Sequence, residues 1–415
     1  MKKYLALLLA FVMTLALAAC GGNSTPGAGG STPPANAPSS PTPAAGNLKI
    51  GVILIGDENE GYTFAHIDGI RKAMAACGLA DSDVVWFYSI PEDENCYDKC
   101  IECVEQGCTL VITNSYGHQT YTQQAAEEHP EVQFIAMTGD TALKSGLPNL
   151  HNAFNMTFES RYVSGIVAGM KLKQLMDEGT VTDPHVGYVG AYPYAEVVSG
   201  YTGFFLGVRS IVPTAYMDVQ YTNSWFDIQG EGKAAEALMA RGCVIIGQHA
   251  DSTGAPQAVQ TAKDNGAAVY SVGYNIDMLA VAPTAALTSS TNDWSVFYTY
   301  AFSTLQNGGT LPTDWSEGYK TGAVAITALG PEVASGTAEA VKAAEDAIKA
   351  GTLHVFDTKT FTVDGQEVTS ALTFDSNGDW ENDTNEGIVD GYYHESEYIS
   401  APSFSLRIDG ITELN

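Results

Sequence analysis

The sequence predicts an α/β protein of two lobes, each built on a parallel β-sheet that helices cover on both faces. The chain has 415 residues, of which 45% are hydrophobic, and this is enough for two packed cores of roughly 150 residues each. Short β-rich segments alternate with segments of helical periodicity, a pattern typical of parallel sheets with crossover helices. The alternation restarts after residue 154, so we expect two sheets rather than one.

The first alternation begins with a β-rich run, Leu48 to Ile55, followed by polar residues 57–62. Apolar residues at helical spacing then predict the first helix. These residues are Phe64, Ile67, Ile70, Met74 and Cys77. After it we expect, in order, a strand at 84–88, a helix at 96–105, a strand at 109–113, a helix near 121–128 and a strand at 133–137.

The second alternation contains four further strand–helix units. The expected helices are 159–176, 195–210, 230–240 and 255–265, and the expected strands are 185–191, 216–222, 243–248 and 267–273. The tail beyond residue 360 is acidic and strand-like, and its pattern indicates no function.

The amino terminus indicates export from the cytoplasm. Lys2 and Lys3 precede an uncharged, apolar-rich run at 4–19. This run is shorter than the ~20 residues of a bilayer-spanning helix. A basic start followed by a short apolar run is typical of a signal peptide.

A cysteine directly follows this signal segment. The run Leu17-Ala18-Ala19-Cys20-Gly21 resembles a bacterial lipobox, so we expect residues 1–19 to be removed and Cys20 to be acylated. Several acyl chains would anchor the protein stably, here on the extracytoplasmic face of the cell membrane. An ordinary secretory signal with an incidental Cys is the alternative. Residues 20–47 are rich in Pro, Gly and Ser and carry no charge, which predicts a flexible tether.

The charge balance excludes some classes of partner. The chain has 48 Asp and Glu against 19 Lys and Arg, a net charge of −29. Nucleic-acid binding requires clustered Lys and Arg to displace counterions from phosphates, so no nucleic-acid partner is expected. Electrostatic adhesion to anionic lipid is disfavoured for the same reason.

Aromatic and carboxylate side chains gather after nearly every predicted strand. In parallel sheets, ligands bind beyond the carboxyl ends of the strands. The residues that fall there include Tyr62, Phe64, Tyr116, Tyr192, Tyr194, Trp225, Phe226, Asp227, Asp251, Tyr274, Asn275 and Asp277. Aromatic faces can stack on a planar ring while carboxylates accept its N–H groups, which suits a nucleobase or a similar heterocycle. Aromatic packing between the two lobes is the alternative interpretation.

Five stretches carry a resemblance to a known family. They are Gly61-Tyr62-Thr63-Phe64-Ala65-His66, Asn114-Ser115-Tyr116-Gly117-His118, Thr222-Asn223-Ser224-Trp225-Phe226-Asp227, Gln248-His249-Ala250-Asp251-Ser252 and Gly273-Tyr274-Asn275-Ile276-Asp277-Met278. In order and spacing they resemble the basic membrane protein family over residues 48–360. Its members are lipoprotein substrate-binding components of ABC importers, related to purine nucleoside receptors.

The resemblance implies both a fold and partners. The fold is the type I periplasmic-binding-protein fold, in which two Rossmann-like lobes, joined by crossover strands, close on a ligand. The partners are an ABC permease and an ATPase. The chain itself lacks the phosphate-binding motif G-x4-G-K-[ST], so it is not expected to be the ATPase. We expect no cofactor and no bound metal, and a tethered receptor of this kind would act as a monomer.

Ligand contacts follow from the resemblance position by position. Nucleoside binders hold a Ser-Phe-Asn-type motif after the first strand, and its Phe stacks on the base; Tyr62-Thr63-Phe64-Ala65-His66 stands there in this chain. The expected ligand-binding residues are Tyr62, Phe64, His66, Tyr116, Trp225, Asp251, Asn275 and Asp277. The family's ribose-contacting Lys is missing after the Leu-Thr-Ser run at 287–289. This departure favours a free purine base, or a nucleoside that is held differently.

The resemblance also implies that the lobes interleave. Residues 48–153 and 276–310 are expected to form the N-terminal lobe, with hinges near 153, 275 and 312. Residues 154–275 and 311–400 are expected to form the C-terminal lobe, and 401–415 a tail.

The predicted function is therefore capture of a purine nucleobase or nucleoside by lobe closure, for import and without catalysis. A receptor for a sugar or an autoinducer on the same fold is one alternative. An extracytoplasmic nucleoside hydrolase is the other.

Two constellations are better explained by structure than by metal binding. Cys96, Cys100 and Cys103 have the C-x3-C-x2-C spacing of an iron–sulfur loop, but they also share one face of the predicted helix, where free Cys packs as a small hydrophobe. The acidic segment 375–386 has an EF-hand-like register without the required central Gly, so we expect a surface hairpin. The pairing of the six cysteines after residue 47 into disulfides stays open.

Overall fold

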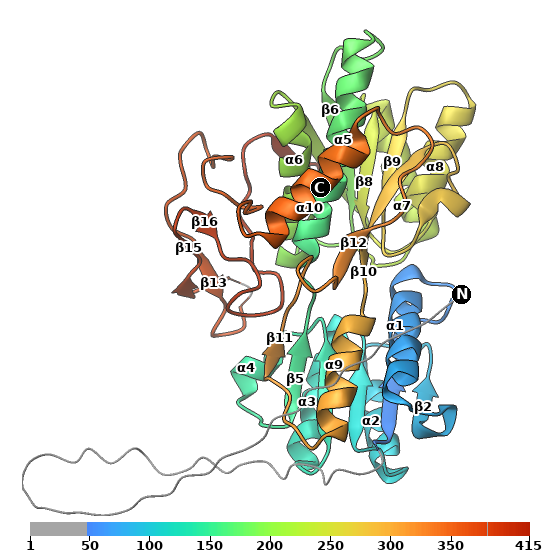
Figure 1. Cartoon of the computed structure of the whole chain (residues 1–415), viewed down its shortest axis with the longest axis vertical. Coiled ribbons are helices and arrows are strands. Elements are labelled where there is room, and N and C mark those ends of the chain that lie inside the picture. The colour runs from blue at the N-terminus through green and yellow to red at the C-terminus, as the bar shows by residue number, and fades with distance from the viewer. Residues whose placement is uncertain (1–47, 380) are drawn as a thin grey trace, which may run out of the picture. The chain divides into compact units, whose positions relative to one another are not determined.

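Two β-sheets organise the part of the chain that the computed structural model describes, residues 48–379 and 381–415 (Figure 1). In each sheet most neighbouring strands are parallel, and helices cover both faces. The α/β class predicted from the alternating pattern is thereby confirmed.

The first sheet contains the four expected strands of the first alternation, a fifth strand at 150–153 that the sequence did not predict, and one strand from much later in the chain. Its strands are β1 (Ile50–Ile53), β2 (Val84–Phe87), β3 (Leu110–Thr113), β4 (Gln133–Met137), β5 (Leu150–Ala153) and β11 (Asp314–Trp315). They lie in the order β11-β5-β4-β3-β1-β2, and every neighbouring pair is parallel.

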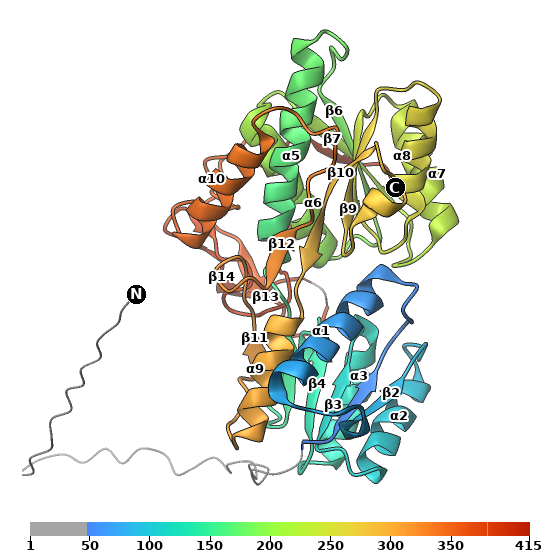
Figure 2. The same cartoon turned by 45° about the vertical axis from the view of Figure 1, so that its right-hand side comes forward.

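Successive residues of these strands pack on opposite faces of the sheet. The helices α1 (Gly61–Cys77) and α9 (Ser295–Gln306) share a core with Ile112, whereas α2 (Glu94–Glu105) and α3 (Gln119–Glu128) share another with Val111. Figure 2 shows α1 and α9 on one side of this sheet. Because side chains alternate along a strand, the continuous apolar runs of these strands fit a sheet that is buried on both faces.

The second sheet repeats the plan with seven strands. They are β6 (His185–Gly190), β7 (Tyr216–Tyr221), β8 (Ile245–His249), β9 (Tyr270–Tyr274), β10 (Ala286–Asn292), β12 (Val324–Ile326) and β17 (Ile411–Glu413), in the order β12-β10-β9-β8-β6-β7-β17. Strand β12 is antiparallel to β10. The helices on one face are α5 (Thr157–Asp177), α6 (Ala195–Ile211) and α10 (Thr337–Lys349), and those on the other are α7 (Ile228–Ala240) and α8 (Gly254–Asp264).

Strand β10 changes the expected course of the chain between the sheets. The segment 276–310 was expected in the first lobe, but Ser289 pairs with Gly273 of β9, so β10 belongs to the second sheet. Pairing there satisfies the backbone groups along the edge of β9, which would otherwise be left buried and unbonded. The chain then returns to the first sheet in α9 and β11. It therefore passes between the sheets near residues 155, 293 and 320, and not at 275.

The segment after α10 packs mainly on the second sheet (Figure 2). It holds two short hairpins, β13 (Leu372–Phe374) with β14 (Thr384–Glu386) and β15 (Ile388–Val389) with β16 (Tyr392–Tyr393). Strands β13 and β14 flank the acidic loop, which confirms the expected hairpin. Residues 401–415, expected to be a tail, include β17, which extends the second sheet beside β7.

The cysteine cluster of α2 is buried as predicted. Cys96, Cys100 and Cys103 are all inaccessible to solvent and pack against the first sheet. All six cysteines within the described residues are free thiols.

Other expectations concern the amino-terminal segment. The predicted signal peptide at 1–19, the acylated Cys20 and the tether at 20–47 lie outside the described residues. Across the described ranges, no helix combines the length and apolarity needed to cross a bilayer.

Candidate functional site

A cavity of about 350 Å³ lies where the carboxyl ends of strands from both sheets meet. Residues that follow β1, β2, β3 and β4 form one wall, and residues that follow β6, β7 and β8, with the last residue of β9, form the other. The lining residues are Ile55, Gly56, Asp57, Asn59, Glu60, Tyr62, Ser89, Ser115, Tyr116, Thr138, Glu196, Trp225, Phe226, Asp251 and Tyr274. Its position is the one that open parallel sheets favour for ligands.

The loop that carries Trp225 is fixed at both of its ends. Asn223 adopts a left-handed conformation with φ 57°, and its N–H donates to the Ala191 carbonyl at 2.8 Å. Asp227 closes the loop as the N-cap of α7 by accepting from the N–H groups of Gln229 and Gly230. Trp225 is further held by Tyr192, whose ring meets it edge-on at 5.2 Å between centroids.

Two of the lining carboxylates come from opposite sheets. Glu60 precedes α1 and accepts a hydrogen bond from the Thr63 hydroxyl. Asp251 follows β8, is buried, and accepts from the Asn275 amide at 2.7 Å. Burial raises the pKa of Glu60, and burial together with the negative charge of Glu60 raises the pKa of Asp251 well above its usual value.

Glu196, in the first turn of α6, is the third carboxylate with a displaced pKa. Burial raises the pKa of Glu196 to about 7 against the opposing effect of Arg161. The His249 Nε2 lies 3.3 Å from its carboxylate, although burial holds the pKa of His249 well below its usual value. This histidine is therefore a neutral hydrogen-bonding neighbour at physiological pH.

A buried arginine lies behind the aromatic wall. The Arg161 guanidinium stacks 3.7 Å from the centre of the Tyr274 ring and donates to the Gln248 carbonyl at 2.5 Å. Because Tyr274 lines the cavity and Arg161 does not, the ring separates this cation from the cavity.

Four of the eight predicted site residues line the cavity: Tyr62, Tyr116, Trp225 and Asp251. A fifth, Asn275, is buried and holds the Asp251 carboxylate. The backbone of Asn275 is left-handed, with φ 60°, and this residue directly follows the end of β9 at Tyr274.

The remaining three predicted residues do not line the cavity. Phe64 is 44% exposed, because two residues along α1 turn it by about 200° from Tyr62. His66 lies one turn below Tyr62 and is fully buried, stacked on Trp294 with its Nδ1 2.6 Å from the Tyr298 hydroxyl. Asp277 caps a short 3₁₀ helix by accepting from the Leu279 N–H.

Lining residues that were absent from the eight predicted ligand contacts include Glu60, Glu196, Phe226 and Tyr274. Phe226 and Tyr274 were among the aromatic residues noted after the predicted strands, and Glu60 and Glu196 lie in the same kind of loop or just after it, so position after a strand is the signal that the four share. Which side chain of such a loop faces inward depends on the phase of the following helix, and the sequence pattern did not resolve it.

A second cavity of about 540 Å³ adjoins the first. The two share Tyr116, Thr138 and Glu196. The far wall comes from the carboxyl-terminal segment between residues 371 and 407 and includes the cationic side chain of Arg407. This segment therefore closes one side of the site.

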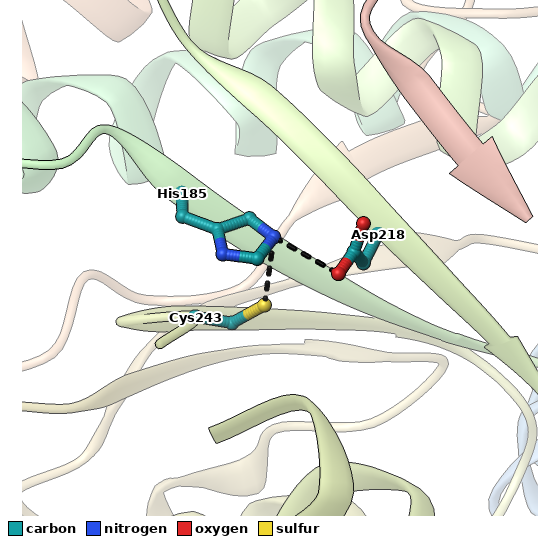
Figure 3. Close-up of side chains that lie close together, drawn as sticks. All are labelled: His185, Asp218 and Cys243. Carbon is teal, nitrogen blue, oxygen red and sulfur yellow. Dashed lines mark hydrogen bonds and ion pairs between the residues drawn. The ribbon is translucent and has the colours of Figure 1, made fainter. Parts of the chain in front are cut away.

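Figure 3 shows three potential metal ligands, His185, Asp218 and Cys243, close together. They lie at the end of the second sheet opposite the cavity. His185 Nε2 is 3.1 Å from an Asp218 carboxylate oxygen and 3.4 Å from the Cys243 sulfur. The residues stand near the amino ends of β6, β7 and β8, whereas the cavity lies at the carboxyl ends. Arg241 donates to the same Asp218 oxygen at 2.6 Å and so already supplies the positive charge that a metal would bring. We interpret the group as a buried ion-pair cluster.

Comparison with known proteins shows the family, while the names of two relatives differ in the ligand. Residues 58–359 match the Bmp family, described as "ABC transporter substrate-binding protein PnrA-like". A purine-binding protein of Brucella abortus is 32% identical over 60% of this chain and 67% of its own length. A Haloferax volcanii protein, whose name provisionally assigns it to glucose binding in an ABC transporter, is 29% identical over 74% of this chain and 73% of its own length.

Solved structures with the same fold include an ABC transporter solute-binding protein from Conexibacter woesei. The TM-score is 0.60 at 20% identity, over 74% of this chain and 98% of that chain. This similarity concerns the fold alone, and it confirms the predicted type I periplasmic-binding-protein architecture.

Proposed function

Since the chain belongs to the Bmp family of PnrA-like ABC transporter substrate-binding proteins, we propose that its ligand is a purine nucleobase or nucleoside, captured outside the cytoplasm for import. The observation that carries this proposal is the composition of the cavity. Five aromatic rings and several carboxylates line a space of about 350 Å³. Such a lining suits a planar ring that can stack and also donate hydrogen bonds. The similarity to a relative named as purine-binding supports the same ligand class.

The mechanism we propose is capture by closure of two lobes. Tyr62 and Tyr116 belong to the lobe of the first sheet, and Trp225 and Asp251 to that of the second. A ligand that contacts both walls binds the closed arrangement more tightly than the open one, so it shifts the population toward closure. The three chain passages between the sheets would act as the hinges.

The receptor would work at the membrane as part of a transporter. We propose that Cys20 carries the lipid anchor, that residues 20–47 tether the binding body, and that a monomer delivers its ligand to an ABC permease driven by an ATPase. The lipobox-like run and the uncharged Pro- and Gly-rich segment support this arrangement.

A sugar is the second candidate ligand. The relative provisionally assigned to glucose binding favours it, and aromatic rings also stack on sugar faces. No comparison favours the nucleoside hydrolase, because the family consists of solute-binding proteins.

A thermal-shift panel on the purified protein tests the proposal. It contains adenine, guanine, hypoxanthine, their nucleosides, ribose, glucose and an autoinducer-type furanose. A ligand that binds only the folded state raises Tm in proportion to the logarithm of its excess over Kd. We expect purines alone to raise Tm; a response to a sugar with none to any purine would overturn the ligand assignment.

A further inference from the structure

Four of the six cysteines within the described residues gather in one core of the first lobe. Cys96, Cys100, Cys103 and Cys108 are buried there, and all four come from α2 or from the turn that directly follows it. Substrate-binding proteins of this family work outside the cytoplasm, and disulfides form and persist in oxidising extracytoplasmic compartments. Whether two of these thiols pair depends on the geometry of the chain between them.

Regular helix geometry excludes the pairs within α2. Cys96 and Cys100 are four residues apart, and Cys100 and Cys103 are three apart. Residues at these spacings have Cβ atoms about 5–6 Å apart, whereas a disulfide requires Cβ atoms about 3.5–4.5 Å apart. Cys96 and Cys103 are two turns apart and therefore farther still. The other two cysteines, Cys77 and Cys243, pack against other cores.

The chain leaves α2 in a turn that brings Cys103 and Cys108 together. Gly107 adopts a left-handed conformation with φ 82°, and its N–H donates to the Val104 carbonyl at 2.8 Å. The Cys108 N–H donates to the Cys103 carbonyl at 3.0 Å. Together these bonds form a Schellman motif, in which the side chains at the positions of Cys103 and Cys108 commonly contact each other across the helix end.

Both sulfurs pack on the same glycine of β1. A Cβ at Gly51 would lie 2.3 Å from the Cys103 Sγ and 3.6 Å from the Cys108 Sγ, so both sulfurs cover its bare backbone. The Cys103 thiol donates a hydrogen bond to the Cys108 sulfur. This bond lowers the pKa of Cys108, assisted by the positive charge of Lys49 and opposed by burial, and it raises the pKa of Cys103. Cys108 therefore forms the nucleophilic thiolate more readily.

We infer that Cys103 and Cys108 form a disulfide in the exported protein, which fastens the end of α2 to the segment that enters β3. The oxidant is the disulfide of an extracytoplasmic thiol–disulfide oxidoreductase, which reacts before folding buries the two sulfurs. The Cys108 thiolate attacks one sulfur of that disulfide and releases the other as a thiolate. Cys103 then attacks the Cys108 sulfur, which forms the new S–S bond and releases the second thiolate. This chain loses two electrons and two protons, and the oxidoreductase gains both as a dithiol.

The test is disulfide mapping of the full chain, collected after export and alkylated during denaturation without reductant. A glutamate-specific protease cuts after Glu102 and Glu105, so Cys103 and Cys108 fall in different peptides. We expect mass spectrometry to find these two peptides joined before reduction and separate after it. Four of the six cysteines within the described residues should carry the alkylating group before reduction, and all six afterwards.

Variants measure what the cross-link does for stability. Reduction should lower the Tm of the wild-type protein, because the cross-link restricts the unfolded chain. Cys108→Ala should unfold at the same Tm with and without reductant. Cys100→Ala, which removes a buried thiol from the same core, is the matched control and should keep both the joined peptides and the dependence of Tm on reductant. The mapping of the wild-type chain stands on its own if a variant does not fold.

Two results would overturn the inference. One is alkylation of all six cysteines in the exported protein without reductant. The other is a disulfide that joins Cys108 to Cys96 or Cys100, because the turn after α2 would then not select the pair. Neither result depends on the ligand, so the proposed function is tested separately.

Discussion

At the scale of single residues, the cavity depends on side chains whose orientation the backbone fixes. Trp225 sits on a loop held by Asn223 and Asp227, and Asn275 orients Asp251. The backbone also fixes the orientation of Phe64: its position on α1 turns the side chain toward solvent, so it does not line the cavity. Substitutions at these positions can test the account one contact at a time.

Trp225→Ala should lower the affinity for a purine. Removing one stacking surface costs about 1–3 kcal/mol where bases stack on aromatic side chains, which corresponds to roughly five- to 150-fold in Kd. Phe64→Ala is the control, because Phe64 lies outside the lining and its loss should leave Kd within about twofold. Calorimetry on both variants measures the difference. A large loss for Phe64→Ala with none for Trp225→Ala would reverse the assignment of the stacking ring.

Glu159→Gln should change how stability depends on pH. Glu159 lies in the first turn of α5 and accepts from the Tyr319 N–H at 2.7 Å, and burial raises the pKa of Glu159 to about 7. The folded state thus holds this proton more tightly than the unfolded state, whose ordinary glutamate pKa is about 4.3. Its contribution to stability is fully present below pH 4.3 and is lost as pH rises to 7.

The neutral glutamine avoids that loss. Relative to wild type, the unfolding free energy of Glu159→Gln should therefore improve between pH 4.5 and 8, by on the order of 2 kcal/mol after allowance for partial solvent contact. Denaturant unfolding of both proteins at the two pH values measures this change. A difference that does not vary with pH would show that Glu159 does not titrate in this range.

At the scale of elements, the packing of α5 on α6 relies on glycine. A Cβ at Gly165 would lie 2.0 Å from the Phe204 carbonyl oxygen, and one at Gly207 would lie 2.1 Å from that of Tyr162. The two backbones approach closely because neither helix carries a side chain at these points. This pair of helices carries Glu196, which lines the cavity, and Arg161, which stacks on Tyr274 behind it.

Gly165→Ala should therefore destabilise the protein, by roughly 1–3 kcal/mol for an overpacked contact. Gly232→Ala in α7 is the matched control, since its Cβ would meet nothing closer than 3.5 Å. Alanine is the better helix former there by about 0.8–1.0 kcal/mol, so this variant should be equal to wild type or more stable. Thermal unfolding measures the Tm of both variants. An equal change in Tm for Gly165→Ala and Gly232→Ala would contradict the tight contact between α5 and α6.

The sequence was most informative about elements and least about which side chains face the site. Periodicity located the helices and strands because each buries a regular apolar face; α6 was expected at 195–210 and spans Ala195–Ile211. It did not predict β10, because Ala286–Asn292 contains mostly Thr, Ser and Asn; the family resemblance placed this segment in the other lobe. It likewise could not separate Tyr62 from Phe64, since both aromatics fit the loop and only the helical phase distinguishes them.

At the scale of the whole binding body, the carboxyl-terminal segment contacts both lobes. Ser400 donates from its N–H and hydroxyl to Asp314 of β11 in the first sheet, while Phe404 packs in the core of the second. The segment therefore bridges the two lobes on one side of the cavities. Any closing motion of the two lobes would have to keep these contacts or break them.

Ligand binding should make the protein more compact in solution. If both walls close on the ligand, small-angle X-ray scattering should give a smaller radius of gyration with saturating adenine than without it. The double variant Trp225→Ala, Asp251→Asn, which loses contacts to one wall, should show no such change at the same ligand concentration. An unchanged radius for the liganded wild-type protein would contradict capture by closure.

The most direct test of the central claim is a calorimetric titration of the purified protein with adenine, adenosine and glucose. The composition of the cavity predicts that adenine or adenosine binds with one-to-one stoichiometry and that glucose produces no binding heat. Saturable binding of glucose, with none of either purine, would contradict the claim that this receptor captures purines.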